Sequence, residues 1–128
     1  MNADERGLNA ITEAVIGAAA YAVANELGVG FLEKVYENAL LVELTRAGHK
    51  VRPQMPVAVR YRDVVVGQYF ADLVVDDGVM VEVKHANGID DAHIAQSLNY
   101  LKATGIKVCL LINFGKSKIE IRRIVRNF

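Results

Sequence analysis

The first part of the chain carries apolar side chains at helical spacing. In residues 8–27 they recur three and four positions apart, and residues 31–48 repeat the pattern. Gly28 and Gly30 interrupt the two segments, and Gly48 ends the second. The pattern predicts two consecutive helices, the second of which packs on the first or on a sheet.

The middle of the chain changes to an alternation of apolar and polar positions. Residues 50–63 alternate toward their end, and two prolines confine their early part to a sheet edge or an irregular lead-in. Residues 64–84 read as two further strands, with a bulge at Gly67 and a turn at residues 76–78. This region therefore predicts three strands, of which the last two form a hairpin.

The last third returns to helical spacing and then to strands. Residues 90–105 predict a helix that carries Ile94, Leu98 and Leu101 at helical spacing and ends at Gly105. Residues 106–114 predict a buried strand, and residues 118–128 a final strand. The predicted order is ααβββαββ, an α/β class with a mixed sheet. With 128 residues, of which 52% are hydrophobic, the chain is long enough for one core, so we expect a single domain over residues 1–128.

Two carboxylates and a lysine stand in the predicted hairpin where a purely structural hairpin would prefer apolar or neutral residues. If the turn has three residues, Val75 faces Val79, and Asp72 then lies directly opposite Glu82. Opposed side chains have Cβ atoms about 5 Å apart, and like charges there are destabilising. Glu82 and Lys84 share one face of the strand. A divalent cation between the carboxylates would relieve the repulsion and leave positions for water and phosphate oxygens.

Three other residues would complete such a site. Glu33 lies in the first turn of the second predicted helix, and its carboxylate would reach the metal from across the sheet. Gln96 and Tyr100 are four residues apart on the third helix, so they share one face and would contact a phosphate or orient Lys84. Taken singly, Glu33 is more typical of a helix N-terminus than of a metal site, and Gln96 and Tyr100 are most typical of a half-exposed helix face. The combination with the hairpin acids favours a site.

Four separated motifs resemble one known family. Residues 10–125 are similar to the GxxExxY proteins, a branch of the PD-(D/E)XK nuclease superfamily. The motifs occur in the family's order and read "GFLEKVY" at 30–36, "YFADLVV" at 69–75, "VEVKHA" at 81–86 and "AQSLNYLKATG" at 95–105.

The resemblance implies a restriction-endonuclease-like αβββαβ core that binds Mg²⁺, for which Mn²⁺ is expected to substitute, and hydrolyses phosphodiester bonds. The superfamily's motif residues carry over as Glu33, Asp72, Glu82 and Lys84, and Gln96 with Tyr100 resembles the Gln-x-x-x-Tyr motif of its exonuclease branch. In such a site Glu33, Asp72, Glu82 and the main-chain carbonyl of Val83 would hold the metal. Lys84 would orient the attacking water and counter the charge of the transition state.

The charge distribution adds a candidate nucleic-acid surface. Fifteen basic and fifteen acidic residues cancel overall, but residues 1–47 carry seven acids and three bases, whereas residues 102–128 carry seven bases and one acid. A basic C-terminal third could contact a phosphate backbone, most simply that of DNA. The candidate residues are Lys116, Lys118, Arg122, Arg123 and Arg126. A chain of this size is expected to need a second copy, as in a homodimer, or a protein partner to enclose a duplex.

Two other hypotheses compete with a nuclease. The chain could be a catalytically weak or inactive nuclease-fold module for nucleic-acid binding or assembly, because it is small, has zero net charge and carries no accessory DNA-reading element. Alternatively, the acids could simply pair with Lys84 in a structural domain. The intact set of Asp72, Glu82 and Lys84 favours chemistry over both.

The apolar stretches, the N-terminus and the cysteine content indicate the cellular compartment of the protein. The longest apolar stretch, residues 14–24, is broken by Gly17 and is shorter than the about 20 residues of a membrane span. The N-terminus carries acids where a secretory signal would be basic, so we expect a cytoplasmic protein without a membrane partner. Cys109 is the only cysteine, which excludes an intramolecular disulfide and a multi-cysteine zinc site and predicts a buried, inert thiol.

Overall fold

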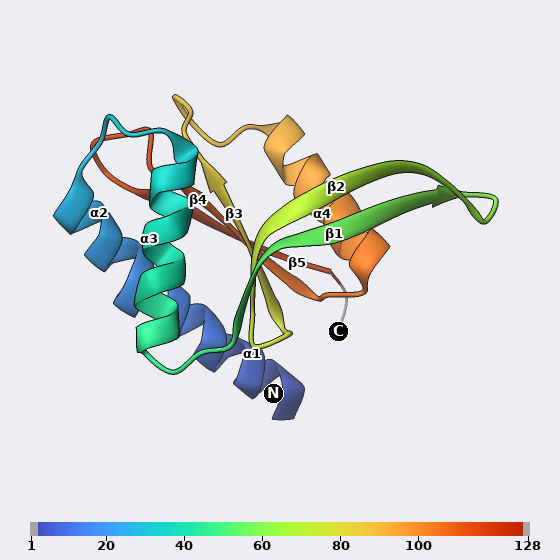
Figure 1. Ribbon diagram of the computed structural model, residues 1–128, viewed down its shortest axis with the longest axis horizontal. Helices are drawn as coiled ribbons and strands as arrows, with labels where there is room; N and C mark the ends of the chain where they lie inside the picture. The colour runs from blue at the N-terminus through green and yellow to red at the C-terminus, as the bar shows by residue number, and fades with distance from the viewer. Residues whose placement is uncertain (1–2, 127–128) are drawn as a thin grey trace.

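A five-stranded mixed sheet with helices on both faces forms the body of the protein (Figure 1). The computed structural model describes residues 3–126, the side chains at positions 3, 4, 18 and 19 excepted. The sheet order is β1-β2-β3-β4-β5, in which only β3 and β4 are parallel. The elements are α1 (Ala3–Glu13), η1 (Ala14–Ala20), α2 (Tyr21–Leu27), α3 (Glu33–Arg46), β1 (Val51–Tyr61), β2 (Val64–Val75), β3 (Val79–Lys84), α4 (Asp91–Thr104), β4 (Val108–Asn113) and β5 (Glu120–Val125). This confirms the predicted order ααβββαββ.

The first predicted helix is longer than expected and contains a π-helical stretch. It begins at Ala3, runs through η1 and ends at Leu27. Judged by length and composition alone, its residues Glu5–Leu27 could cross a membrane, which the shorter apolar run did not predict. In the structure Val15 and Val23 are buried in the core that this helix shares with α3 and the sheet.

Two apolar cores lie on opposite faces of the sheet. The first joins the sheet to the N-terminal helices and α3, and the second joins it to α4. In α4 the buried residues are Ser97, Tyr100 and Leu101, whereas Leu98, which the helical pattern placed on the apolar stripe, is 41% exposed. Cys109 lies in the second core, where burial raises the pKa of its thiol to about 12, as expected for an inert cysteine.

The turn between β2 and β3 has the predicted three residues. Asp76 and Asp77 adopt left-handed backbone conformations, with φ of 51° and 56°, and Gly78 completes the turn. The pairs Val75 with Val79 and Leu73 with Val81 confirm the register that places Asp72 beside Glu82. In the described structure the backbone pairing of β2 with β3 ends at the pair Leu73–Val81.

Beyond this point β1 and β2 continue together as a two-stranded arm that projects from the body (Figure 1). Arg62 and Asp63, both with positive φ, form the two-residue turn at its tip. The register shifts between Val59, which pairs with Gly67, and the next residue, so the predicted bulge is present beside Gly67. β1 is an edge strand, which agrees with its two prolines.

A buried asparagine ties together the loops that follow β3 and β4. The Asn113 amide donates to the Ala86 carbonyl at 3.0 Å, and its oxygen accepts from the Ala86 and Gly115 backbone N–H groups, each at 3.0 Å. A Cβ atom on Gly115 would lie 2.6 Å from the backbone N and O of Ala86. Because Lys84 is two residues before Ala86, this contact positions the end of β3.

Replacing Gly115 by alanine is expected to destabilise the protein by about 1–3 kcal/mol, because the Cβ atom clashes with backbone rather than with a movable side chain. Urea unfolding measures the change. Gly7→Ala is the matched control: nothing lies within 4 Å of a Cβ atom in that helical position, so its stability should stay the same or rise slightly. Equal unfolding midpoints for the two variants would contradict the close approach.

Candidate functional site

The candidate site lies where β2 separates from β3. The Asp72 backbone N–H donates to Glu82 Oε1 at 3.3 Å, and the Val83 N–H donates to Asp72 Oδ2 at 2.8 Å. These two side chains thus take the place of the backbone hydrogen bonds that would continue the strand ladder. Glu82 is 4% exposed, and Asp72 is half-buried. The fork therefore holds two adjacent carboxylates away from bulk water.

The two carboxylates have raised pKa values. Burial raises the pKa of Glu82 to about 8, and the charge of Asp72 adds to this effect, while Lys84 opposes it. Burial also raises the pKa of Asp72 to about 6, against the lowering effect of the Val83 N–H. The neighbouring groups therefore do not fully compensate two negative charges at the fork. A bound cation would compensate them.

Lys84, Gln96 and Tyr100 lie beside these acids, as the sequence predicted. Lys84 Nζ donates to Gln96 Oε1 at 3.1 Å, so α4, which packs on this face of the sheet, holds the lysine in position. Tyr100 lies on the same face of α4, and burial, followed by the charge of Glu82, raises the pKa of its hydroxyl. The fold thus gathers five of the residues predicted for the site, Asp72, Glu82, Lys84, Gln96 and Tyr100, together with the backbone of Val83.

Glu37, and not the predicted Glu33, is the third carboxylate at Asp72. Glu33 begins α3 and is exposed, and in the described part of the chain no hydrogen bond or ion pair joins it to Asp72 or Glu82. Glu37 is 5% exposed, and its charge contributes to the raised pKa of Asp72. The physical reason is the direction of the helix faces, since Glu37 is in line with buried Leu40 and Leu44. The sequence signal that could have revealed Glu37 is its position as a carboxylate within this apolar stripe.

A strained glutamine in β1 holds Glu37. Gln54 has a φ of 52°, and its side-chain amide donates to both Glu37 oxygens, at 3.0 Å each. Lys34 makes an ion pair of 2.6 Å with the same carboxylate, but its side chain is 60% exposed. The left-handed backbone falls at the position of β1 beside Asp72, between the pairs Pro53–Leu73 and Met55–Ala71. This local distortion brings an amide to the buried acid.

Replacing Gln54 by alanine is therefore expected to lower the free energy of unfolding by about 1–3 kcal/mol, because Glu37 would lose its inner partner. Chemical unfolding at neutral pH measures the change. Gln68→Ala, an exposed glutamine in the neighbouring strand, is the control and should unfold like the wild type. A loss of the same size in both variants would show that the amide contact with Glu37 is not the cause.

The predicted basic residues do not form one surface. Arg122 and Arg123 are adjacent in β5 and therefore point to opposite faces of the sheet. Arg122 lies in register with Leu111 and Glu82, on the face of the carboxylates. Arg123 instead donates to Asn9 Oδ1 of α1 at 2.9 Å, on the other face, so the structure does not bring it together with Arg122 in one nucleic-acid surface.

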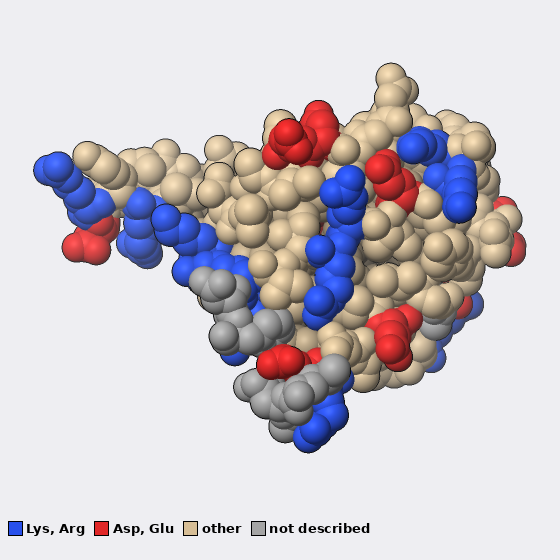
Figure 2. Space-filling view, turned by 180° about the vertical axis from the view of Figure 1, so that it is seen from behind, with Lys and Arg blue, Asp and Glu red and all other residues tan. Residues whose placement is uncertain are grey.

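The other three basic residues are at two ends of the sheet. Lys116 and Lys118 lie in the loop between β4 and β5, at the end of the sheet where β3 reaches Lys84. Arg126 is at the opposite end, where its backbone N–H bonds to the Lys107 carbonyl. The face seen in Figure 2 shows Lys and Arg side chains in separate groups, one of which extends along the arm. The simple count of C-terminal bases missed this separation.

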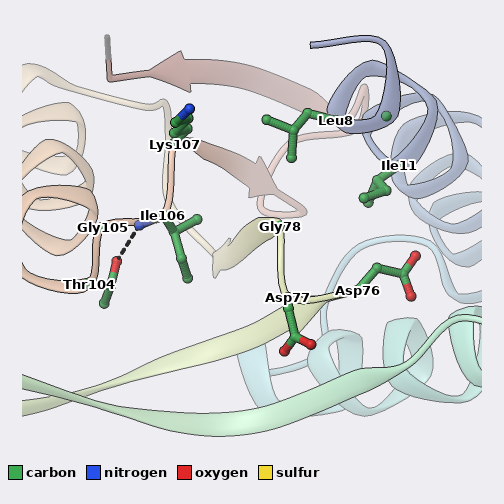
Figure 3. Close-up of a pocket in the computed structure, with 10 residues that line it drawn as sticks. Leu8, Ile11, Asp76, Asp77, Gly78, Thr104, Gly105, Ile106 and Lys107 are labelled. Carbon is green, nitrogen blue, oxygen red and sulfur yellow. Dashed lines mark hydrogen bonds between the residues drawn. The ribbon is translucent and has the colours of Figure 1, made fainter. Parts of the chain in front are cut away.

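A groove of about 1100 Å³ separates the arm from α4 and includes Gln96 and Tyr100. A second cavity, of about 500 Å³, is at the other end of the sheet, where Leu8 and Ile11 of α1 approach Gly78 (Figure 3). Its acids are already paired, since Asp76 bonds to His49 at 2.6 Å and Asp77 pairs with Lys50 at 3.2 Å. Of these two cavities in the described part of the chain, the groove is the one that adjoins the site, through Gln96.

The donor atoms at the fork suit a hard divalent cation. Asp72 and Glu82 offer carboxylate oxygens, which Mg²⁺ and Mn²⁺ prefer, and Mg²⁺ usually keeps several waters beside one or two carboxylates. Among residues 3–126, however, no group of three or more His, Cys, Asp or Glu side chains is arranged to hold a metal. A cation here would therefore depend on these two acids, the Val83 carbonyl and water.

Comparison with known proteins identifies the superfamily and a similar fold. Residues 9–124 match the family model described as "PD-(D/E)XK nuclease superfamily". No curated protein matches the chain. Among solved structures, an alkaline exonuclease from Laribacter hongkongensis has a similar fold, with a TM-score of 0.51 and 14% sequence identity over 91% of this chain and 82% of that one. At this identity the likeness is one of fold.

Proposed function

This chain belongs to the PD-(D/E)XK nuclease superfamily, and we propose that it is a metal-dependent nuclease. It would hydrolyse phosphodiester bonds of nucleic acid, with DNA as the main substrate. One observation carries the proposal: the buried carboxylate of Glu82 and the half-buried carboxylate of Asp72 meet at the fork beside Lys84. Burying these two acids carries a high desolvation cost, which their hydrogen bonds to two backbone N–H groups offset only in part.

The residues of the fork have separate roles in this proposal. Asp72, Glu82 and the carbonyl of Val83 would hold Mg²⁺ or Mn²⁺, and the ion would supply the charge that polarises the phosphate and acidifies a water molecule. Lys84 would orient that water and stabilise the additional negative charge of the transition state. Gln96 holds the lysine by the 3.1 Å hydrogen bond. Glu37 adds negative charge behind Asp72.

We further infer that the chain is a GxxExxY protein, because the motif residues have definite tasks here. Gly30 has a φ of 111°, which favours glycine. The Tyr36 hydroxyl donates to the Gly28 carbonyl at 2.6 Å and accepts from the Phe31 N–H at 3.2 Å, and its ring stacks on that of Phe114. The motif therefore orders the loop before α3. This supports a positioning role for Tyr36, with Glu33 at the helix N-terminus.

A nuclease-fold module without turnover is the second candidate. The observation that favours it is the absence, within the described residues, of a cluster of three metal-binding side chains. Such a module would bind nucleic acid through its basic groups and would not need a cation at the fork.

The proposed activity is tested by incubating the protein with linear and circular duplex DNA, single-stranded DNA and RNA. Each substrate is offered with Mg²⁺, with Mn²⁺ and with chelator. We expect cleavage of DNA that requires the metal and is absent in Asp72→Asn, whose neutral side chain has the same shape. Binding without cleavage of any substrate would favour the module. Cleavage that survives chelation would contradict a metal-dependent mechanism.

A further inference from the structure

The groove between the arm and α4 is a second feature of the same side of the molecule, and it leads to the fork. Two β-strands form one wall and a helix forms the other. Gln96 connects it to the site, since this residue lines the groove and accepts the hydrogen bond of Lys84. Resting on the proposed function, we propose that this groove binds a single strand of nucleic acid and directs it toward Lys84.

The charge of the groove suits a phosphate backbone. Arg60 of the arm and Lys102 of α4 lie on its two walls, and none of its lining residues is acidic. This contrasts with the chain as a whole, in which acids and bases are equal in number. A groove with cations on both walls and no acid attracts an anionic polymer without reading its sequence.

Aromatic rings lie at the end of the groove next to the site. Tyr69 from the arm and Tyr100 from α4 approach with ring centroids 5.6 Å apart and an interplanar angle of 40°. Tyr69 is 49% exposed although its side chain is large, so part of the side chain is accessible to a nucleotide. Stacking on an exposed aromatic ring beside a basic groove is the usual mode of binding for unpaired nucleotides.

The dimensions favour one strand over a duplex. A drug-sized ligand occupies a site of about 300–1000 Å³, so the groove of about 1100 Å³ has room for only a few nucleotides. Gln96 and Asn99 of α4 line the groove, and their amide groups can bond to any base edge. A duplex would keep its bases stacked on one another, and Tyr69 could not reach their faces.

The test is fluorescence anisotropy with a labelled oligothymidylate and with a labelled duplex of equal length, both in chelator so that no cleavage occurs. We expect Tyr69→Ala to weaken oligothymidylate binding by about tenfold, because a stacking contact is lost, and to change duplex binding less. Arg60→Gln is expected to weaken binding and to reduce the salt dependence by about one phosphate contact. Arg62→Gln is the matched control at the arm tip, outside the groove lining, and should bind like the wild type.

The outcomes separate this inference from the proposed activity. Equal losses in Arg60→Gln and Arg62→Gln, or unchanged binding in Tyr69→Ala, would overturn the groove as the binding path even if the protein cleaves DNA. Strong oligothymidylate binding that depends on Tyr69, in a protein without cleavage, would support the groove and reject the nuclease. Sedimentation analysis tests whether a second copy of the chain occupies the groove instead. A wild-type dimer that dissociates in Tyr69→Ala would show that it does, and would also overturn the inference.

Discussion

Replacing Lys84 by alanine is expected to reduce the rate of metal-dependent DNA hydrolysis by about 10²–10³-fold, the usual effect of removing one group that stabilises transition-state charge. Lys84 is the only lysine that the described structure places in hydrogen-bond contact with α4 beside the two acids. Its removal should leave binding to the groove largely intact, because Arg60 and Lys102 remain. Single-turnover cleavage of a labelled oligonucleotide at saturating protein measures the chemical step apart from binding.

Lys50→Ala is the matched control, since this lysine is exposed at the other end of the sheet, where it pairs with Asp77. It should cleave at the wild-type rate. Lys84→Arg is a stricter test, because a guanidinium keeps the charge but not the compact ammonium that Gln96 holds, and we expect it to recover only part of the activity. Equal rates for the wild type and Lys84→Ala would mean that the cleavage does not come from this site.

A second large effect is expected on the pH and metal dependence of stability. The folded-state pKa values of Asp72 and Glu82, about 6 and about 8, lie above the usual carboxyl range near 4. Their protonated forms therefore contribute stability that is fully present below about pH 4 and is lost as the pH rises through 6 and 8. In chelator, the melting temperature should accordingly fall between about pH 5 and 8.

A divalent cation should reverse this loss, because it binds the ionised carboxylates of the folded protein only. At a metal concentration of about 100 Kd the stabilisation is about 2.7 kcal/mol, which corresponds to a rise of several degrees in melting temperature. The rise should be larger at pH 8 than at pH 5, where protons compete with the metal. Differential scanning fluorimetry with Mg²⁺, Mn²⁺ and chelator across this range measures both effects.

Glu82→Gln tests the cause. It removes one charge at constant shape, so the fall of the melting temperature with pH should flatten and most of the metal effect should disappear. Glu26→Gln, at an exposed position of α2, is the control and should behave like the wild type. A wild type that is indifferent to metal at pH 8, or a Glu82→Gln variant with the full metal effect, would contradict a cation site at the fork.

Local patterns were sufficient for most of the fold. Alternation and helical spacing predicted the element order, and the three-residue turn alone predicted the register from Val75–Val79 to Leu73–Val81. This works because the side-chain period of a strand is two, so a turn of known length determines every later pair. The pattern on α4 was less reliable, since Leu98 is exposed and Ser97 is buried. A helix touches its sheet along a line that spacing does not locate.

Part of the candidate site could also be predicted. Asp72, Glu82 and Lys84 are close in sequence and share one hairpin, so their proximity follows from strand geometry alone. Gln96 and Tyr100 were placed on one helix face, although the contact of Gln96 with Lys84 required the packing of α4 on the sheet. Glu37 was missed because its neighbour in the site is in a strand more than thirty residues away, and the distorted Gln54 that bonds to it has no sequence signature.

The sequence by itself determined the strands, the helices and the hairpin acids, because each depends on neighbours a few residues away. Only the tertiary structure decided which helix residue faces Asp72, on which side of the sheet each arginine of β5 lies, and that the arm and α4 enclose a groove beside Lys84. These features depend on contacts between segments far apart in the chain, where small rotations of a helix or a single left-handed strand residue change which side chains meet.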